Sequence, residues 1–155
     1  MIKKLFLTLS LTLIAIFGAV NTAAADKLSD EAEAVELLNE LRESQGLQPL
    51  KWNPSSKLQR AAEVRAKEIT EEFSHTRPDG STCFTVLKEF GLSYSICGEN
   101  IAMGTQMSPQ KAMEMWTNSP GHYRNMINPD FEEIGLARYK IGETIYWVQL
   151  FYTRR

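Results

Sequence analysis

Apolar residues in the first half of the chain recur at the spacing of an α-helix. One stripe follows Asp30, which has Glu33 three residues further on as in a capping box, and Gly46 ends the pattern. A second stripe follows Asn53-Pro54, an N-cap with a first-turn proline, and runs to about residue 72. The pattern predicts two amphipathic helices, and the charged residues of the second are expected to form a solvated surface. The apolar members of the two stripes are Ala34, Leu37, Leu38 and Leu41, then Leu58, Ala61, Ala62, Ala66, Ile69 and Phe73.

The pattern changes along the second half of the chain. A short helix is expected over about 82–90, near-alternation over 92–101 indicates a strand, and Ser108 begins a further helix. Two alternating runs within 133–151 flank a turn at 140–144 and predict a hairpin, which we expect at the centre of the sheet. Helices early in the chain and strands late in it indicate the α+β class, with helices covering an antiparallel sheet.

The N-terminus has the pattern of an export signal. Lys3 and Lys4 precede an apolar run over 5–20, and three alanines at 23–25 form a small-residue cleavage site. The alternative is a membrane anchor, but the run is short for a spanning helix and contains hydroxyl side chains. We therefore expect secretion, to the extracellular space or the periplasm, with no stable membrane anchor after cleavage. The predicted organisation is a signal peptide at 1–25, a short tail at 26–30 and one domain at 31–155.

Charge narrows the range of partners. The 155-residue chain has 17 basic and 19 acidic residues, and loss of Lys3 and Lys4 with the signal leaves 15 basic residues against 19 acidic ones. This acidic balance argues against nucleic acid as a partner. The roughly 130 residues that remain suit a single domain with one core. The oligomeric state is left open.

Cys83 and Cys97 are the only cysteines. An even count in a chain with an export signal favours pairing, so we predict a disulfide between them. Closing a loop of about 14 residues would contribute about 3 kcal/mol in the chain-entropy model. The alternative is that Cys97 is a thiol nucleophile beside Glu99, which requires a reduced thiol and a nearby histidine.

The chain has only two histidines, and both lie in polar turns. His75 lies in SHTRPDG at 74–80 and His122 in SPGHYRN at 119–125, with Gly98-Glu99-Asn100 between them in the sequence. Histidine binds metals and moves protons near neutral pH, and loops carry functional residues. This favours one site shared by His75, Glu99 and His122, while two unrelated surface histidines remain the alternative.

Four motifs carry a family resemblance, which spans about residues 31–153. They are SHTRPDGS at 74–81, GENIA at 98–102, WTNSPGHYRNMINPDFEEIGLA at 116–137 and YWVQLF at 146–151. In this order they resemble the CAP superfamily (cysteine-rich secretory proteins, antigen 5, pathogenesis-related 1; the SCP domain), especially its compact bacterial members. The resemblance implies a three-layer α-β-α sandwich with a small antiparallel sheet, and a cleft where two histidines and two acidic residues gather.

Three of those four cleft positions match, at His75, Glu99 and His122. Where larger members carry a glutamate shortly after the tryptophan, this chain has Thr-Asn-Ser-Pro. The resemblance implies that His75 and His122 contact Zn²⁺ or another divalent cation, and that Glu99 acts as an orienting group or a base. With two protein ligands, we expect the ion to be weakly held.

The resemblance also implies a binding role for this cleft. We expect a binding module whose cleft, which includes Asn100 and Tyr123 beside His75, Glu99 and His122, takes a small apolar ligand such as a lipid or sterol, or a peptide. The first alternative is a metal-dependent, protease-like hydrolase in the same cleft. The second is a non-catalytic extracellular scaffold whose histidine and glutamate groups only hold loops together.

Overall fold

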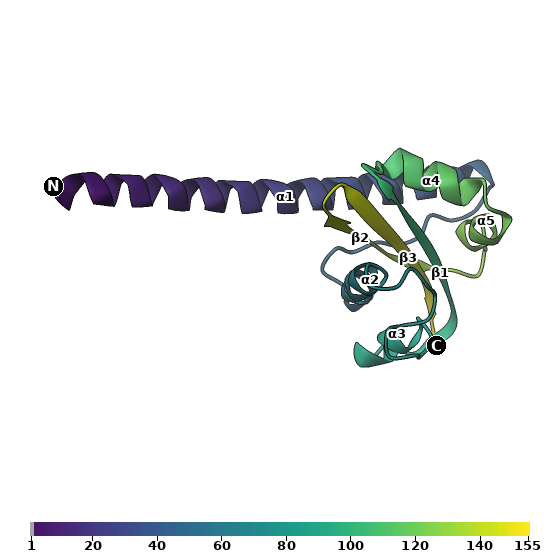
Figure 1. Cartoon of the computed structure of the whole chain (residues 1–155). Coiled ribbons are helices and arrows are strands. Elements are labelled where there is room, and N and C mark those ends of the chain that lie inside the picture. The colour runs from purple at the N-terminus through teal and green to yellow at the C-terminus, as the bar shows by residue number, and fades with distance from the viewer. Residues whose placement is uncertain (1) are drawn as a thin grey trace.

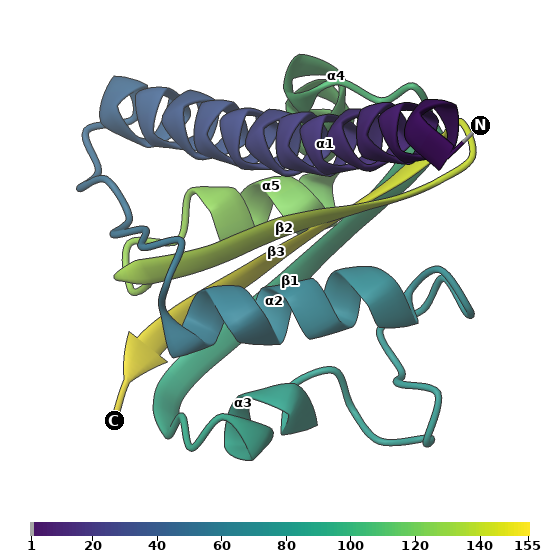
Figure 2. The same ribbon diagram turned by 90° about the vertical axis from the view of Figure 1, so that its left-hand side faces the viewer.

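A three-stranded antiparallel sheet forms the middle layer of the protein, and helices cover both of its faces (Figures 1 and 2). The computed structural model describes residues 2–155, and their side chains from residue 22 onward. Helices α1, α4 and α5 lie on one face of the sheet, and α2 and α3 lie on the other. The predicted α-β-α sandwich is thus confirmed. The helices are α1 (Ile2–Ser44), α2 (Lys57–Glu68), α3 (Thr85–Glu89), α4 (Pro109–Thr117) and α5 (Pro120–Met126).

The strand order is β1-β3-β2. The predicted hairpin forms between β2 (Glu133–Ile141) and β3 (Thr144–Arg154), and Gly142 has the positive φ of 57° that its tight turn requires. The prediction that this hairpin is the central pair is wrong for β2, which is an edge strand. The strand β2 lies at the edge because β1 (Tyr94–Thr105) pairs along the other side of β3, so β3 alone is central.

Alternating residues of β3 divide the core into two halves. Trp147 and Phe151 pack with α1 and α4, whereas Val148 and Leu150 pack with α2. The two halves are separate clusters, one under each helical layer. Buried Trp147 donates its indole N–H to the carbonyl of Met107 at 3.2 Å, so its one polar atom is satisfied.

The first helix extends further toward the N-terminus than the stripe predicted. Asp30 is not its N-cap but lies within α1, where its carboxylate pairs with Arg138 Nη2 at 2.8 Å. Residues 26–30, expected as a tail, are helical, and Lys27 contacts Glu63 on α2 at 2.8 Å. Most of the predicted signal peptide lies outside the residues whose side chains are described, and it stays a prediction. Among the described residues, no helix has the length and apolar character that a membrane crossing needs.

The apolar stripe of α2 is confirmed except at its end. Leu58, Ala61 and Ile69 are buried, together with the alanines between them, whereas Phe73 is 42% exposed. The helix ends at Glu68 rather than near residue 72, so Phe73 falls in the following loop and leaves the helical face. The other predicted elements form with shifted bounds, and β1 extends beyond the predicted end at residue 101.

A substitution of Gly135 tests the close contact between α2 and β2. A Cβ at this position would lie 2.6 Å from the backbone oxygen of Leu58, so Gly135→Ala should force α2 away from β2. We expect the free energy of unfolding to fall by about 1–3 kcal/mol, measured by urea denaturation. The matched control is Gly104→Ala, where the Cβ would meet only the flexible end of Met107 and the loss should be smaller. Equal losses for the two variants would contradict this account.

Candidate functional site

A buried ion pair between Glu99 of β1 and Arg65 of α2 lies at the base of the candidate site. Arg65 donates from Nε to Glu99 Oε2 at 2.8 Å and from Nη2 to Glu99 Oε1 at 3.3 Å. The Glu99 side chain is 1% exposed, and Arg65 is fully buried. The two-fold contact fixes the plane of the carboxylate, and it joins the sheet to the helix that covers it.

The position of Arg65 corrects the expectation that the charged residues of this helix form a solvated surface. Arg65 lies seven residues after Leu58 and four before Ile69, so it belongs to the apolar face of α2 and points at the sheet. Its charge is tolerated there because Glu99 lies opposite. Sequence reasoning missed Arg65 as a site residue, although its helical position was a usable signal.

Arg65 also holds the loop that carries the first histidine. Its Nη2 donates to the backbone oxygen of Ser74 at 2.9 Å, and its Nη1 donates to Glu68 at 2.7 Å. Arg77 reaches Glu68 from the far side of the loop, with Nε 3.0 Å from Oε2. Burial alone would raise the pKa of Glu68, but hydrogen bonds from Arg77 and Arg65 outweigh burial and lower the pKa below its usual range.

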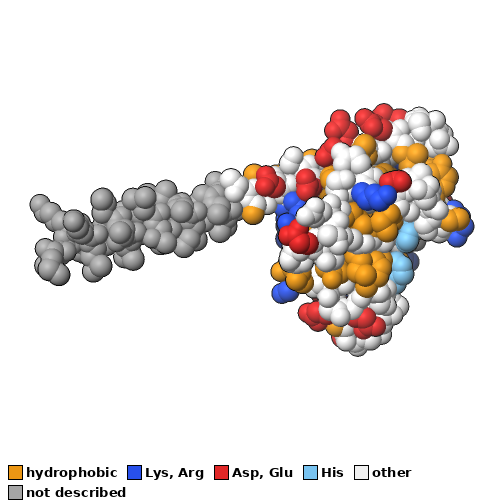
Figure 3. Space-filling view, turned by 45° about the horizontal axis from the view of Figure 1, so that its top comes forward, with side chains coloured by type: hydrophobic (Ala, Val, Ile, Leu, Met, Phe, Trp, Pro, Cys, Tyr) orange, Lys and Arg blue, Asp and Glu red, His pale blue; other side chains and the backbone are white. Residues whose placement is uncertain are grey.

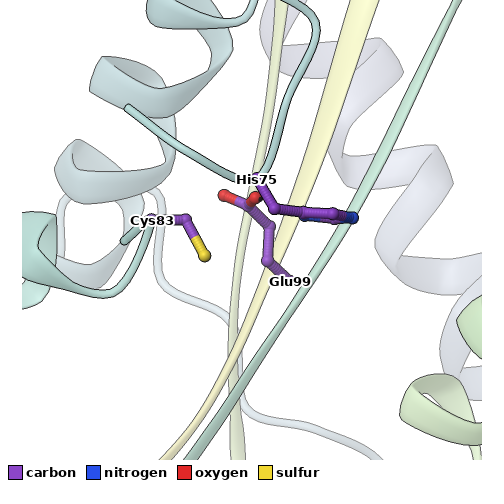
Figure 4. Close-up of side chains that lie close together, drawn as sticks. All are labelled: His75, Cys83 and Glu99. Carbon is purple, nitrogen blue, oxygen red and sulfur yellow. Dashed lines mark hydrogen bonds and ion pairs between the residues drawn. The ribbon is translucent and has the colours of Figure 1, made fainter. Parts of the chain in front are cut away.

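His75 is oriented by the buried carboxylate. Its Nδ1 lies 2.8 Å from Glu99 Oε1, and 56% of its side chain is exposed (Figure 4). A carboxylate accepts hydrogen bonds, so this contact assigns the ring proton of neutral His75 to Nδ1. Nε2 is then the ring nitrogen with a free lone pair, on a side chain that is open to solvent.

His122 lies on α5, which begins at the predicted proline of the SPGH motif. Burial, and next the nearby charge of His75, lower the pKa of His122 and favour its neutral form. On the surface, histidine side chains lie on one face of the domain beside hydrophobic side chains (Figure 3). The two histidines are 47 positions apart in the sequence.

A network of amide side chains fixes the backbone of His122. Asn100 is completely buried, and its Nδ2 donates to the His122 carbonyl at 3.0 Å and to Gln149 Oε1 at 3.0 Å. Asn125 of α5 donates in turn to Asn100 Oδ1 at 2.8 Å. Asn100 therefore holds α5 against the sheet from inside the protein. Gln149 and Asn125 were missed by sequence reasoning, which carries no signal for buried amide pairs.

Tyr123 is half-buried on α5, next to His122. Three cavities in the described part of the chain are lined by neither Tyr123 nor His75, Glu99 or His122. The His75 side chain is largely exposed, and His122 is half-buried. Their assignment to one ligand-binding cleft stays a prediction.

The structure holds Cys83 and Cys97 as free thiols, so the predicted disulfide is not formed in it. The Cys83 side chain lies beside Glu99 (Figure 4). The ligand atoms of His75, Cys83 and Glu99 all lie within 4.8 Å of one another. Burial, followed by the negative charge of Glu99, raises the pKa of Cys83 to about 12. Burial also raises the pKa of Cys97, which disfavours the thiolate that the nucleophile alternative needs.

Comparison with known proteins identifies the family. The model of the cysteine-rich secretory protein family, CAP, matches residues 35–151. The chain belongs to the CAP family. An uncharacterized protein of Bacillus subtilis, YkwD, is 37% identical to it over 123 residues, which are 78% of this chain and 46% of YkwD. The chain thus spans less than half the length of this curated relative.

Two solved structures of bacterial proteins have the same fold. An extracellular protein of Bacillus anthracis containing an SCP domain superposes with a TM-score of 0.73 at 25% identity, over 83% of this chain and 41% of that one. An outer surface protein of Borrelia burgdorferi gives a TM-score of 0.73 at 26% identity, over 82% of this chain and 94% of that one. This CAP domain therefore has relatives of the extracellular and outer-surface type.

Loss of the Glu99 charge should destabilise the domain strongly. Glu99→Gln removes the buried counter-charge of Arg65 and leaves it only the partly exposed Glu68, and we expect a loss of about 3 kcal/mol in the free energy of unfolding. His75→Ala should cost less than about 1 kcal/mol, because His75 is largely exposed. Chemical denaturation of both variants checks this. The double variant Arg65→Met/Glu99→Leu should be more stable than Glu99→Gln, and a Glu99→Gln variant as stable as wild type would contradict the account.

The ion pairs of Glu68 should make stability depend on pH. Because the pKa of Glu68 is lower in the folded state than its ordinary 4.5, the charged group stabilises the fold above pH 4.5 and loses this effect as the pH falls below it. We expect the stability difference between wild type and Glu68→Gln to be largest near pH 7 and to shrink on acidification. Denaturation series between pH 7 and pH 3 measure it, with the exposed Glu114→Gln as control. A difference that is constant over this range would refute the prediction.

Proposed function

We propose that this CAP domain is an exported, non-catalytic binding module in which His75 and His122 hold a divalent metal ion such as Zn²⁺. One observation carries the proposal: the 2.8 Å contact between His75 Nδ1 and a carboxylate that is itself fixed by Arg65. Histidines that bind metals usually donate their other ring N–H to such a carboxylate, which sets the tautomer and the ring orientation. Exposed Nε2 of His75 is then the ligand atom.

The protonation state of His122 supports its role as the second ligand. Metals bind neutral imidazole, and burial together with the neighbouring His75 lowers the pKa of His122. Two protein ligands leave the remaining coordination positions to water or to donor atoms of another molecule. We therefore expect weak binding of the ion, and a metal that can be shared with a bound partner.

The contacts of Glu99 favour a positioning role over a catalytic one. Its Oε1 lies against His75 and Arg65, its Oε2 accepts from Arg65, and its side chain is 1% exposed. A general base must reach the proton of its substrate, directly or through one water. These contacts weigh against a hydrolase that uses Glu99 as its base.

Export rests on the N-terminal pattern and on the type of the relatives. The basic residues, apolar run and alanines of residues 1–25 have the order of a signal peptide. The Bacillus anthracis relative is an extracellular protein, and that of Borrelia burgdorferi is an outer surface protein. Both features support a role outside the cytoplasm.

Calorimetric titration with zinc chloride tests the metal site. The protein is purified without a histidine tag and treated with chelator, and we expect weak, saturable binding of one Zn²⁺. His75→Ala and His122→Ala should abolish the heat, and Glu99→Gln should weaken binding about 10- to 100-fold. Glu114→Gln, an exposed acid on α4, should bind as wild type does.

Thermal unfolding without metal distinguishes the metal-binding proposal from the scaffold alternative. Unchanged stability of His75→Ala with lost zinc binding supports the proposal. Equal zinc heats for wild type and His75→Ala would overturn it. A large loss of stability in the histidine variants, with no zinc binding by wild type, would favour the scaffold instead.

A further inference from the structure

A cavity of about 990 Å³ opens at the edge of the sheet, where α1, α2 and the end of β2 meet. Its wall includes residues of both covering helices and of the hairpin, and it excludes the residues of the histidine site. Part of the lining is apolar. Its apolar and aromatic side chains include Val64, Phe90, Tyr139 and Ile145.

The edge strand β2 is closed by side chains along most of its length. Gln59 of α2 accepts from the Leu136 N–H at 3.1 Å and donates to the Leu136 carbonyl at 2.8 Å. The buried Glu31 of α1 accepts from the Arg138 N–H at 3.1 Å. These side chains take the hydrogen-bonding positions that a fourth strand would occupy.

The closure stops before the end of the strand. Alternate residues of β2 point their backbone N–H and C=O groups away from β3. Leu136 and Arg138 are two of these outward-facing residues, and Lys140 is the next along the strand. Within residues 22–155, no group pairs with the outward N–H of Lys140. Arg138, Tyr139 and Lys140 all line the cavity, so the open end of the strand edge faces it.

The cavity wall carries unpaired positive charge. Five basic and three acidic side chains line it, in a chain whose net charge is −2. Two of the acids are already neutralised, since Asp30 pairs with Arg138 and Glu63 pairs with Lys27. Lys67 and Lys140 make no ion pair in the described part of the chain.

Arg138 adds a buried donor to this wall. Its side chain is 10% exposed, and its Nε is buried without a hydrogen-bond partner. Such a group is costly unless something accepts from it. The wall is therefore complementary to an anionic partner.

We infer that this cavity binds a short extended peptide segment with acidic side chains, which adds to the free end of β2. The Lys140 N–H and the Arg138 carbonyl pair with the peptide backbone, as in other cases of strand addition. Acidic side chains of the peptide pair with Lys67 and Lys140, and apolar ones lie on Phe90 and Val64. Only the last residues of the strand are open, so charge pairing supplies much of the affinity. This site is independent of the proposed metal site.

Fluorescence anisotropy tests the charge part of the inference. The purified full chain is titrated against a labelled, acetylated peptide Glu-Val-Glu-Val-Glu at low salt, with Lys-Val-Lys-Val-Lys as control. We expect saturable binding of the acidic peptide, at least about tenfold tighter than that of the basic one. Lys67→Glu should weaken binding about tenfold or more, and Lys88→Glu, an exposed lysine of α3 outside the cavity, should change it less than about twofold.

A second pair of variants tests the backbone part. Lys140→Gln and Lys140→Pro both remove the charge, but only proline removes the outward N–H. Proline is tolerated where an edge strand's N–H faces outward, so thermal unfolding should show both variants folded. We expect Lys140→Pro to bind the acidic peptide about tenfold more weakly than Lys140→Gln. Equal affinity of the two variants, equal binding of the two peptides, or an unaffected Lys67→Glu variant would overturn the inference.

Discussion

The contact between Arg65 and Glu99 determines how this domain presents His75. Taking these two charges out of water costs several kcal/mol for each ion, and their mutual attraction offsets that cost only when the geometry is good. The pair therefore requires α2 to lie at one position over β1. The Ser74 carbonyl bonds to the same guanidinium, so the loop before His75 is fixed by the same requirement. The position of the exposed His75 ring is therefore set by the two buried charged groups of Arg65 and Glu99.

The second histidine is held by a different kind of interaction with the same result. Asn100 is uncharged and buried, and it binds the backbone of His122 rather than its ring. Glu99 and Asn100 are neighbours on β1, and one supports each histidine. Two adjacent residues of one strand thereby set the positions of a loop and a helix that are far apart in the sequence. The GENIA motif is explained in this way as a support for the site.

Periodicity in the sequence predicted the helices because their apolar faces are continuous. It could not show that β1 pairs with the far side of β3, since alternation within a strand does not identify the neighbour in the sheet. Arg65 was recoverable, because its place on the apolar face of α2 followed from helical spacing. The proximity of the Cys83 side chain to Glu99 could not be predicted from the sequence, because it depends on how the loop before α3 packs against Glu99. Asp30 had the sequence of an N-cap, yet its partner, Arg138, is more than 100 residues away.

The hydrogen bonds of Gln59 limit how the edge strand β2 can pair with a strand of another molecule. Its amide group has the same donor and acceptor as a peptide bond, and it occupies both outward positions of Leu136. An exposed strand edge is a template for unwanted pairing between molecules. Gln59 thereby imitates one peptide unit of a neighbouring strand at Leu136, while the Lys51 carbonyl accepts from the N–H of Ile134 and Glu31 accepts from that of Arg138. Pairing with another molecule is thereby blocked along the middle of β2, and only the end of that strand near Lys140 keeps an open N–H in the described part of the chain.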